Sequence, residues 1–349
     1  MRLGLNLGYW GAGNDADNLV LAREADKLGY SVVWAAEAYG SDAATVLSWI
    51  AAKTDKIDIG SAVFQIPART PAMTAMTAAT LDTLSGGRFR LGLGVSGPQV
   101  SEGWHGVRFA KPLQRTREYV EVVNMALARK KVQYEGDFFT LPLPDGPGKA
   151  LTLTAHPVRE EIPFYLAAIG PKNLELAGEL FDGWLAIFYS PEFAGELKTN
   201  IEAGRAKAGK TMEGFDIVPT VPVVFGENID ECAAPLRAYS ALYIGGMGSR
   251  DKNFYNQLVS RMGYEAAAAE IQDLYLSRKQ GEAIEAVPFD FIDKTALIGP
   301  PDRVKERLHA YDDAGVTTLT VASYAADLQT RLDMIRTMSE LVDQAGLAE

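Results

Sequence analysis

The 349-residue sequence has little of what disulfide scaffolds and metal sites require. It contains one cysteine, Cys232, and only three histidines, His105, His156 and His309, which are scattered along the chain. A single cysteine excludes an intrachain disulfide and is compatible with a reducing compartment. No HExxH, CxxC or carboxylate cluster has the spacing of a metal site, and no GxSxG segment marks a nucleophile elbow. We therefore expect a protein without a bound metal.

The sequence also lacks an excess of positive charge and a long apolar run. It has 34 Lys and Arg against 45 Asp and Glu, which gives a formal net charge of −11. Nucleic acids and anionic membranes both require a basic patch on their partners, so neither is expected here. No run spans a bilayer, and a strand pattern begins at Arg2 without a signal peptide. These features predict a cytoplasmic protein that acts on a small-molecule substrate.

Strand and helix patterns alternate along the chain. With 47% hydrophobic residues, the chain can bury a large core. Eight apolar strand candidates favour a closed (β/α)8 barrel over an open doubly wound sheet, with residues 1–349 as a single domain. Two segments are additions to the eight strand–helix units. Residues 133–154 form an insertion after the fourth helix, and residues 228–293 form a helical excursion before the eighth strand. The strand candidates are residues 2–8, 31–35, 57–63, 88–94, 163–168, 183–188, 216–225 and 316–322.

Residues 57–98 form the unit around which the chain is organised. An apolar strand is followed by a helix over residues 71–84, for which Thr70 is the N-cap and Ser85-Gly86-Gly87 the stop. A second strand then opens into Ser96-Gly97-Pro98. Such a βαβ unit places its two strands parallel. Polar and glycine residues therefore gather at the carboxyl ends of both strands, where α/β proteins bind their ligands.

Two segments of this unit, GSAVFQIPARTP and LDTLSGGRFRLGLGVSGP, resemble the bacterial luciferase-like superfamily. The resemblance is strongest to its coenzyme F420-dependent oxidoreductase branch and extends over nearly the whole chain. It implies a luciferase-like (β/α)8 TIM barrel that transfers a hydride between F420, a 5-deazaflavin, and a small organic substrate. It also implies that the barrel pairs as a homodimer.

The resemblance implies a set of cofactor contacts. A bulge with a non-prolyl cis peptide at Ala62–Val63 presses on one face of the ring, and Ser96 and Gly97 meet the ring edge. The turn at Gly170, Pro171 and Lys172 holds the cofactor phosphate. Free N–H groups at a helix N-terminus bind phosphate on general grounds as well, although an ordinary strand-to-helix turn has the same residues. The further contacts are Gly8 and Gln65.

The sequence leaves several candidates for the proton donor, because it departs from the superfamily pattern. A histidine commonly follows the acid at Glu37, whereas this chain has Ala38. The candidate replacements are Glu37 itself, Tyr39, and Glu102 and His105 in the loop after the fourth strand, and a carboxylate or histidine among them could protonate a substrate as hydride arrives. Each of the four could equally be an ordinary solvated loop residue.

Two other functions fit the same barrel. The first is an FMN-dependent monooxygenase, in which reduced flavin activates oxygen. The second is a non-catalytic flavin- or deazaflavin-binding barrel. Ala38 supports this alternative, because it stands where the superfamily commonly has a histidine. F420 differs from FMN in its polyglutamate tail, which needs an open and preferably basic exit groove, and the sequence alone does not show one.

Overall fold

The computed structural model of the protein describes residues 1–8, 15–250 and 252–349. Within these residues, eight parallel strands close into a barrel because β9 and β10 pair at the seam. The predicted (β/α)8 barrel is therefore confirmed. Each strand pairs with the next in the order β1 (Arg2–Asn6), β2 (Val32–Ala35), β3 (Asp58–Ser61), β5 (Phe89–Gly94), β8 (Phe164–Ala167), β9 (Gly183–Ala186), β10 (Asp216–Phe225) and β12 (Thr318–Ala322).

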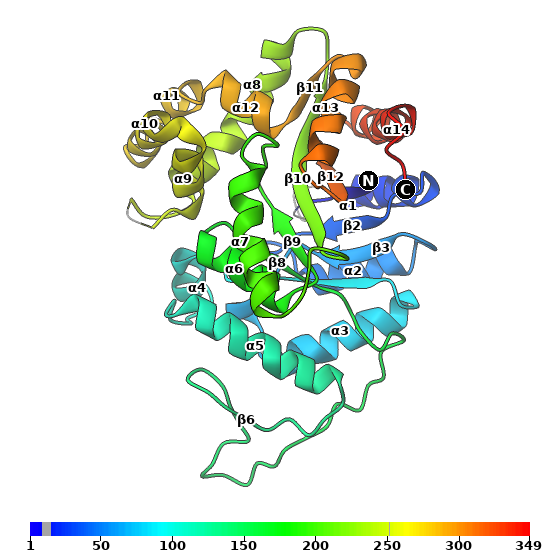
Figure 1. Ribbon diagram of the computed structural model, residues 1–349, viewed down its shortest axis with the longest axis vertical. Helices are drawn as coiled ribbons and strands as arrows, with labels where there is room; N and C mark the ends of the chain where they lie inside the picture. Colours follow the sequence, from blue (N-terminus) through cyan, green and yellow to red (C-terminus); the bar gives the residue numbers. More distant parts are fainter. Residues whose placement is uncertain (9–14, 251) are drawn as a thin grey trace.

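Helices surround this barrel, and the two chain ends lie near each other on one side of it (Figure 1). The capping signals in the sequence act as predicted. Thr70 Oγ1 accepts a hydrogen bond from Met73 N at 3.1 Å, and Gly86 ends the same helix in the left-handed region at φ 71°. The surrounding helices are α1 (Asp15–Lys27), α2 (Ala43–Ala51), α3 (Pro71–Ser85), α5 (Pro112–Leu127), α6 (Pro171–Leu180), α7 (Ala194–Lys207), α13 (Pro301–Asp313) and α14 (Leu328–Gln344).

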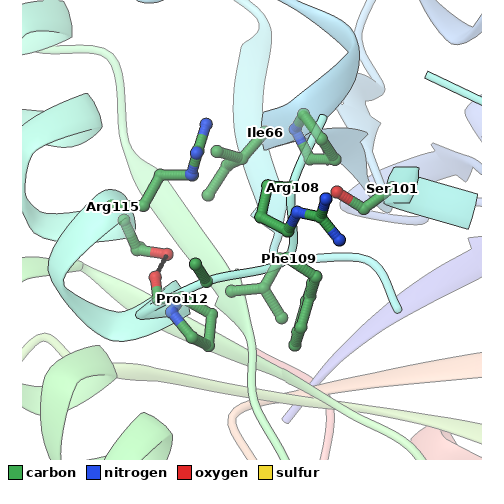
Figure 2. A pocket seen from close by; sticks show the side chains of 10 residues that line it. Ile66, Ser101, Arg108, Phe109, Pro112 and Arg115 are labelled. Carbon is green, nitrogen blue, oxygen red and sulfur yellow. Dashed lines mark hydrogen bonds between the residues drawn. The ribbon is translucent and has the colours of Figure 1, made fainter. Parts of the chain in front are cut away.

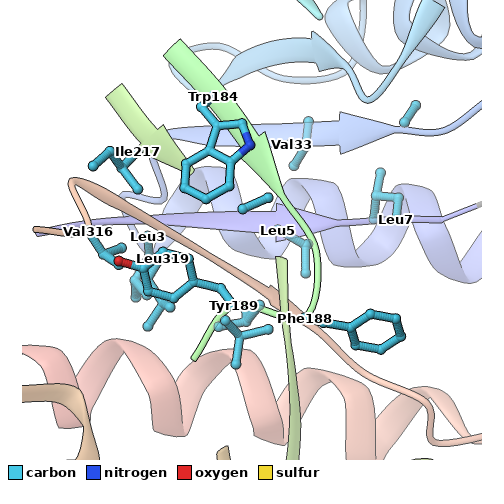
Figure 3. Packing of buried hydrophobic residues seen from close by; sticks show 14 of the residues in the cluster. Leu3, Leu5, Leu7, Val33, Trp184, Phe188, Tyr189, Ile217, Val316 and Leu319 are labelled. Atoms are coloured by element: carbon cyan, nitrogen blue, oxygen red, sulfur yellow. The ribbon is translucent and has the colours of Figure 1, made fainter. Parts of the chain in front are cut away.

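The outward side chains of the strands form the main core, between the sheet and the helices. Figure 3 shows part of this layer, including Leu5, Val33 and Trp184. The inward side chains form a separate cluster of Val32, Trp34, Tyr165 and Val218. Strand residues alternate between the two layers because successive side chains point to opposite faces. The interior of the barrel is therefore a packed layer and not a pore.

The predicted insertion and helical excursion are both present. The insertion contains the antiparallel pair β6 (Tyr134–Glu135) and β7 (Thr140–Leu141) and extends away from the barrel beyond α5 (Figure 1). The excursion gathers on one side of the barrel. Its helices are α8 (Ile229–Ala241), the π-helix η2 (Leu242–Gly246), α9 (Phe254–Val259), the π-helix η3 (Ser260–Tyr264), α10 (Glu265–Leu276), α11 (Gln280–Glu285) and α12 (Phe289–Thr295).

Three short elements were not predicted. β4 (Phe64–Gln65) resumes the pairing after β3, and β11 (Leu297–Gly299) pairs with the end of β10. Helix α4 (Pro98–Gly103) follows β5, so Glu102 belongs to a helix and the expectation that it lies in a loop is wrong. Elements of two to six residues are too short to show a period, and tertiary pairing decides them.

No described helix combines the length and the apolar character that crossing a bilayer requires. Within the described residues, no three His, Cys, Asp or Glu side chains converge as metal ligands would. The single domain over residues 1–349 stays a prediction.

Candidate active site

The site begins with a bulge between β3 and β4. Gly60 pairs with Arg90 and Phe64 pairs with Leu93, so the first strand uses one residue more than β5 over the same distance. The peptide bond between Ala62 and Val63 in this bulge is cis, as predicted. Ser61 replaces the missing ladder bonds: its Oγ accepts from Gly92 N at 2.9 Å and donates to Gly92 O at 2.8 Å.

The bulge rests on a floor of packed rings inside the barrel. Trp34 and Tyr165 meet edge to face, with centroids 5.3 Å apart and an interplanar angle of 74°. Ala62 and Leu185 pack against this cluster from the side of the carboxyl strand ends. Because interiors are close-packed, the floor fixes the height of the bulge in the barrel.

Gln65 and Ser96 form a hydrogen-bonded pair beside the bulge. Ser96 Oγ donates to Gln65 Oε1 at 3.0 Å, and Gln65 Nε2 donates to Ala38 O at 2.6 Å. Ser96 has a φ of 61°, a conformation that a residue with a side chain rarely adopts and that concentrates at functional sites. The structure thus brings the ends of β2, β4 and β5 together through two predicted cofactor contacts.

The two other predicted glycine contacts lie at neighbouring strand ends. Gly8 has a φ of 64° after β1, and its carbonyl accepts from Ala36 N at 3.1 Å. Gly97 follows Ser96 and is the N-cap of α4. Both therefore border the same end of the barrel as the bulge.

Glu37 is almost buried, and its carboxylate is fully engaged. It accepts hydrogen bonds from Ala43 N at 3.1 Å, from Gln65 N at 3.3 Å, and from Arg69 Nη2 and Nε at 3.1 and 3.3 Å. Arg69 also pairs with Asp42. Burial lowers the pKa of Arg69, but Glu37 and Asp42 outweigh it, so the net shift is upward. Glu37 therefore fastens the loop after β2 to the segment after β4.

The two remaining candidate acids differ in their partners. Glu102 Oε1 accepts from Phe109 N at 3.0 Å and lies 3.5 Å from Arg108 Nη1. By contrast, the Nε2 atom of His105 is buried and has no hydrogen-bond partner among the described residues. A buried polar atom without a partner is costly. The ring of His105 is thus the one candidate whose polar atom still needs a ligand.

The predicted phosphate site lies at the N-terminus of α6. Gly170 is the N-cap, no side chain caps the helix, and a Cβ on Gly170 would meet nothing within 4 Å. Lys172 Nζ lies 2.9 Å from Glu175 Oε2, so its charge is directed along the helix. The Nη2 atom of Arg261 donates to Ile169 O at 2.9 Å, which brings a second cation to this strand end. The sequence missed Arg261, because it comes from η3 in the excursion.

An aromatic cluster covers the ends of β9 and β12. Phe188, at φ 51°, packs against the rings of Tyr239, Tyr243 and Tyr255 at 5.7, 5.9 and 6.5 Å. Tyr324 lies 5.0 Å from Tyr239. Burial, followed by the neighbouring Tyr324 and Tyr243, raises the pKa of Tyr239 well above its ordinary value. Figure 3 shows Phe188 among the buried residues of the core, together with Trp184 and Tyr189. The cluster is a wall of rings that carries neutral hydroxyls.

A cavity of about 420 Å³ adjoins this cluster at Tyr324. It lies between the ends of β10 and β12, α8 and α14, and its walls are mostly apolar. Its lining includes Val223, Phe225, Pro235, Ser323, Thr330 and Met334.

A closed barrel whose strand ends carry a cis-peptide bulge, a buried amide–hydroxyl pair and an uncapped helix N-terminus defines a cofactor-dependent enzyme of the TIM-barrel class. The model of the luciferase-like monooxygenase family matches residues 8–318. The chain belongs to this family, and within it to the branch whose members are named coenzyme F420-dependent oxidoreductases.

Two relatives of this branch show the similarity. Rv3520c of Mycobacterium tuberculosis, which carries the provisional name coenzyme F420-dependent oxidoreductase, is 43% identical over 334 residues, covering 94% of this chain and 96% of its own. The 5,10-methylenetetrahydromethanopterin reductase of Archaeoglobus fulgidus is 31% identical over 303 residues, covering 86% of this chain and 87% of its own.

Solved structures agree with this placement. The coenzyme F420-dependent tetrahydromethanopterin reductase from Methanopyrus kandleri superposes with a TM-score of 0.81 at 26% identity, over 99% of this chain and 97% of its own. An F420-dependent secondary alcohol dehydrogenase, in complex with an F420–acetone adduct, shares the fold at a TM-score of 0.79 and 19% identity, over 99% of this chain and 98% of its own.

The hydrogen bonds and the ion pair of the Glu37 carboxylate give a first prediction. Glu37→Gln should lower the free energy of unfolding by about 3 kcal/mol, because it leaves the guanidinium of Arg69 with a weaker partner in a nearly buried position. Arg69→Met should have a cost of the same order, and the double variant should cost less than the sum of the two. Urea unfolding measures all three. Asp302→Asn, which changes an exposed pair with Lys305, is the control and should cost about 0.5 kcal/mol or less. A negligible loss for Glu37→Gln would contradict the positioning role.

Proposed function

We propose that this coenzyme F420-dependent oxidoreductase transfers a hydride between the deazaflavin ring of F420 and a small organic substrate. The observation that carries the proposal is the bulge between β3 and β4, which stands on a floor of packed rings with Gln65 and Ser96 beside it. The names of one relative and of two structural neighbours supply the cofactor. When bound, F420 supplies a ring carbon that accepts or donates a hydride.

The residues present fit this cofactor. Ala62 and Val63 would support one face of the ring. The Ser96 hydroxyl oxygen, whose proton goes to Gln65 Oε1, offers an acceptor to the ring edge, and the second N–H of the Gln65 amide offers a donor. Gly8 and Gly97 would leave room for the ring. The open space at Gly170 and the uncapped start of α6 suit a phosphate, which the first-turn N–H groups would bind. Arg261 adds positive charge there, and Pro171 and Lys172 complete the turn.

His105 is the proton carrier in this proposal. The carboxylate of Glu37 is committed to Arg69 and two backbone N–H groups, and that of Glu102 to Phe109 N. The buried Nε2 of His105 has no partner among the described residues, so it can hold a proton for a substrate oxygen or nitrogen. Glu37 and Glu102 then act as positioning residues for the loops of the site.

The aromatic cluster is the wall on the substrate side. Phe188 follows β9 and Tyr239 lies on α8, which follows the neighbouring strand β10, and their rings meet at 5.7 Å. Rings of this kind exclude water and offer hydroxyl donors to a small organic molecule. The excursion that carries Tyr239, Tyr243 and Tyr255 would thus determine which substrates enter.

We also propose a homodimer in the cytoplasm. Helix α3 exposes Met73, Met76 and Leu84, and the neighbouring α2 exposes Trp49. Exposed apolar side chains on adjacent helices favour a second copy of the chain as the partner. Sedimentation equilibrium tests this directly, and a monomer at micromolar concentration would contradict it.

The cofactor assignment can be tested by titration. The purified protein should bind F420 tightly and FMN weakly when each is followed by fluorescence. The reverse order would contradict the proposal and favour the FMN-dependent monooxygenase, which oxygen consumption with reduced FMN would then test. If the protein binds neither F420 nor FMN, the cofactor assignment is contradicted.

The role of His105 can be tested apart from binding. His105→Asn should leave the dissociation constant of F420 within about twofold. It should lower the rate of F420 turnover, with a substrate found by screening, by about 100-fold, the usual contribution of a positioned proton donor. His309→Asn, at an exposed position of α13, is the control and should change neither. Unchanged turnover in His105→Asn would assign the proton to another group.

A further inference from the structure

A second, small cleft of about 10 Å³ lies beside the candidate ring site (Figure 2). Ile66 and Pro67 line one wall and directly follow Gln65. Val95 lines the cleft as well and directly precedes Ser96. The cleft therefore borders the Gln65–Ser96 pair. Its remaining lining comes from the α4–α5 connection and the first turn of α5: Ser101, Arg108, Phe109, Ala110, Pro112, Arg115 and Thr116.

Arg115 has no anionic partner in this cleft. Its Nε atom is buried without a hydrogen-bond partner, and its guanidinium makes no ion pair within the described residues. Its one close neighbour is the ring of Phe138, whose centroid lies 4.4 Å from the guanidinium carbon. Burial lowers the pKa of Arg115, against a smaller opposite effect of Glu118. A buried Nε–H without an acceptor is costly, whereas the Nη atoms of Arg115 are not among the buried polar atoms and are open to a ligand.

Other buried or half-buried arginines have oxygen acceptors, which are carboxylates for some and a carbonyl or amide oxygen for Arg205 and Arg331. On the same helix, Arg117 pairs with Glu179 at 2.6 Å. Inside the barrel, Arg90 pairs with Asp58 at 2.8 Å. Arg115 differs from them although the chain carries a net charge of −11 and acidic groups are abundant.

The nearest carboxylate cannot serve Arg115, because it is already engaged. Glu118, one turn further along α5, accepts hydrogen bonds from the backbone N–H groups of Asp137, Phe138 and Phe139 at 3.1, 2.8 and 3.3 Å. It also accepts from Gln114 Nε2 at 3.2 Å. Glu118 thus holds the β6–β7 turn, and with it the ring of Phe138, against Arg115.

A second guanidinium lines the same cleft. The side chain of Arg108 is 81% exposed, and its ion-pair contact is with Glu102 at 3.5 Å. So loose a contact leaves the side chain free to turn toward a ligand. The residues that line the cleft include no carboxylate, so two cations border a space without a protein anion.

We propose that Arg115, assisted by Arg108, binds a carboxylate beside the ring site. A planar guanidinium donates two parallel hydrogen bonds to a carboxylate, and that of Arg115 packs on the ring of Phe138 at the border of the cleft. The inference rests on the proposed function, because it assigns the anion to the same ligand complex. The carboxylate has two possible sources: the glutamyl tail of F420 or an acidic substrate.

Binding of two deazaflavins to the whole protein separates the sources. The first is F420, and the second is the phosphorylated chromophore without the lactyl-glutamyl tail. If the tail is the anion, Arg115→Gln should weaken F420 binding at least fivefold and leave the tail-free chromophore within twofold. Arg115→Lys, which keeps the charge, should recover part of the loss. Arg117→Gln removes one charge from the same helix and should leave both constants unchanged.

If an acidic substrate is the source, Arg115→Gln should leave both deazaflavin constants within twofold. Calorimetry with acetate as the probe then supplies the readout. Wild-type protein loaded with F420 should bind acetate but not acetamide, and Arg115→Gln should lose the acetate binding. A melting temperature like that of the wild type shows that each variant is folded.

If Arg115→Gln, once folded, changes neither F420 affinity nor acetate binding, the carboxylate subsite is overturned. Failure of the proposed function gives a different result: the wild type then binds neither deazaflavin. Acetate titration of the unloaded wild type and Arg115→Gln still tests Arg115 in that case.

Discussion

Two aromatic rings packed edge to face inside the barrel, Trp34 and Tyr165, support the parts of the site that lie above them. Their size is accommodated because small residues stand opposite. A Cβ on Gly60 would lie 2.3 Å from the Trp34 ring, and one on Gly183 would lie 2.4 Å from the Tyr165 ring. Ala62 and Leu185 rest on these rings. A larger residue at either glycine would displace the floor and the bulge with it.

The same rings divide the barrel into two chemical environments. On the side of the amino ends of the strands, Asp216 accepts hydrogen bonds from Tyr165 Oη at 2.9 Å and Thr318 Oγ1 at 2.8 Å, and it pairs with Arg90. These buried groups satisfy one another and serve stability. On the side of the carboxyl ends, polar atoms such as His105 Nε2 lack partners within the described residues. Stability and chemistry thus occupy opposite ends of the barrel, as the TIM-barrel plan requires.

The contacts of two arginines connect segments of the site to neighbouring parts of the barrel. Arg69 joins the loop after β2 to the segment after β4, and Arg261 joins the excursion to the end of β8. Each therefore links a segment that carries candidate ligand contacts to a rigid part of the barrel. The helical excursion is tied to the barrel mouth by such contacts and by the rings around Phe188, so it belongs to the site and not to a separate surface.

The sequence by itself determined the barrel, the capped ends of α3 and the turn at Gly170 that begins α6, and its family resemblance placed the cis peptide at Ala62–Val63. These features depend on periodicity, caps and motifs that lie within a few neighbouring residues. Only the tertiary structure decided that Glu37 is saturated by Arg69, that His105 Nε2 and Arg115 lack partners among the described residues, and that Arg261 and the tyrosines reach the mouth. Those facts depend on which distant segments pack together: Arg261 and Ile169 are 92 residues apart, and Glu37 and Arg69 are 32 apart. Side-chain partners at such separations are set by packing, which no local pattern of residues encodes.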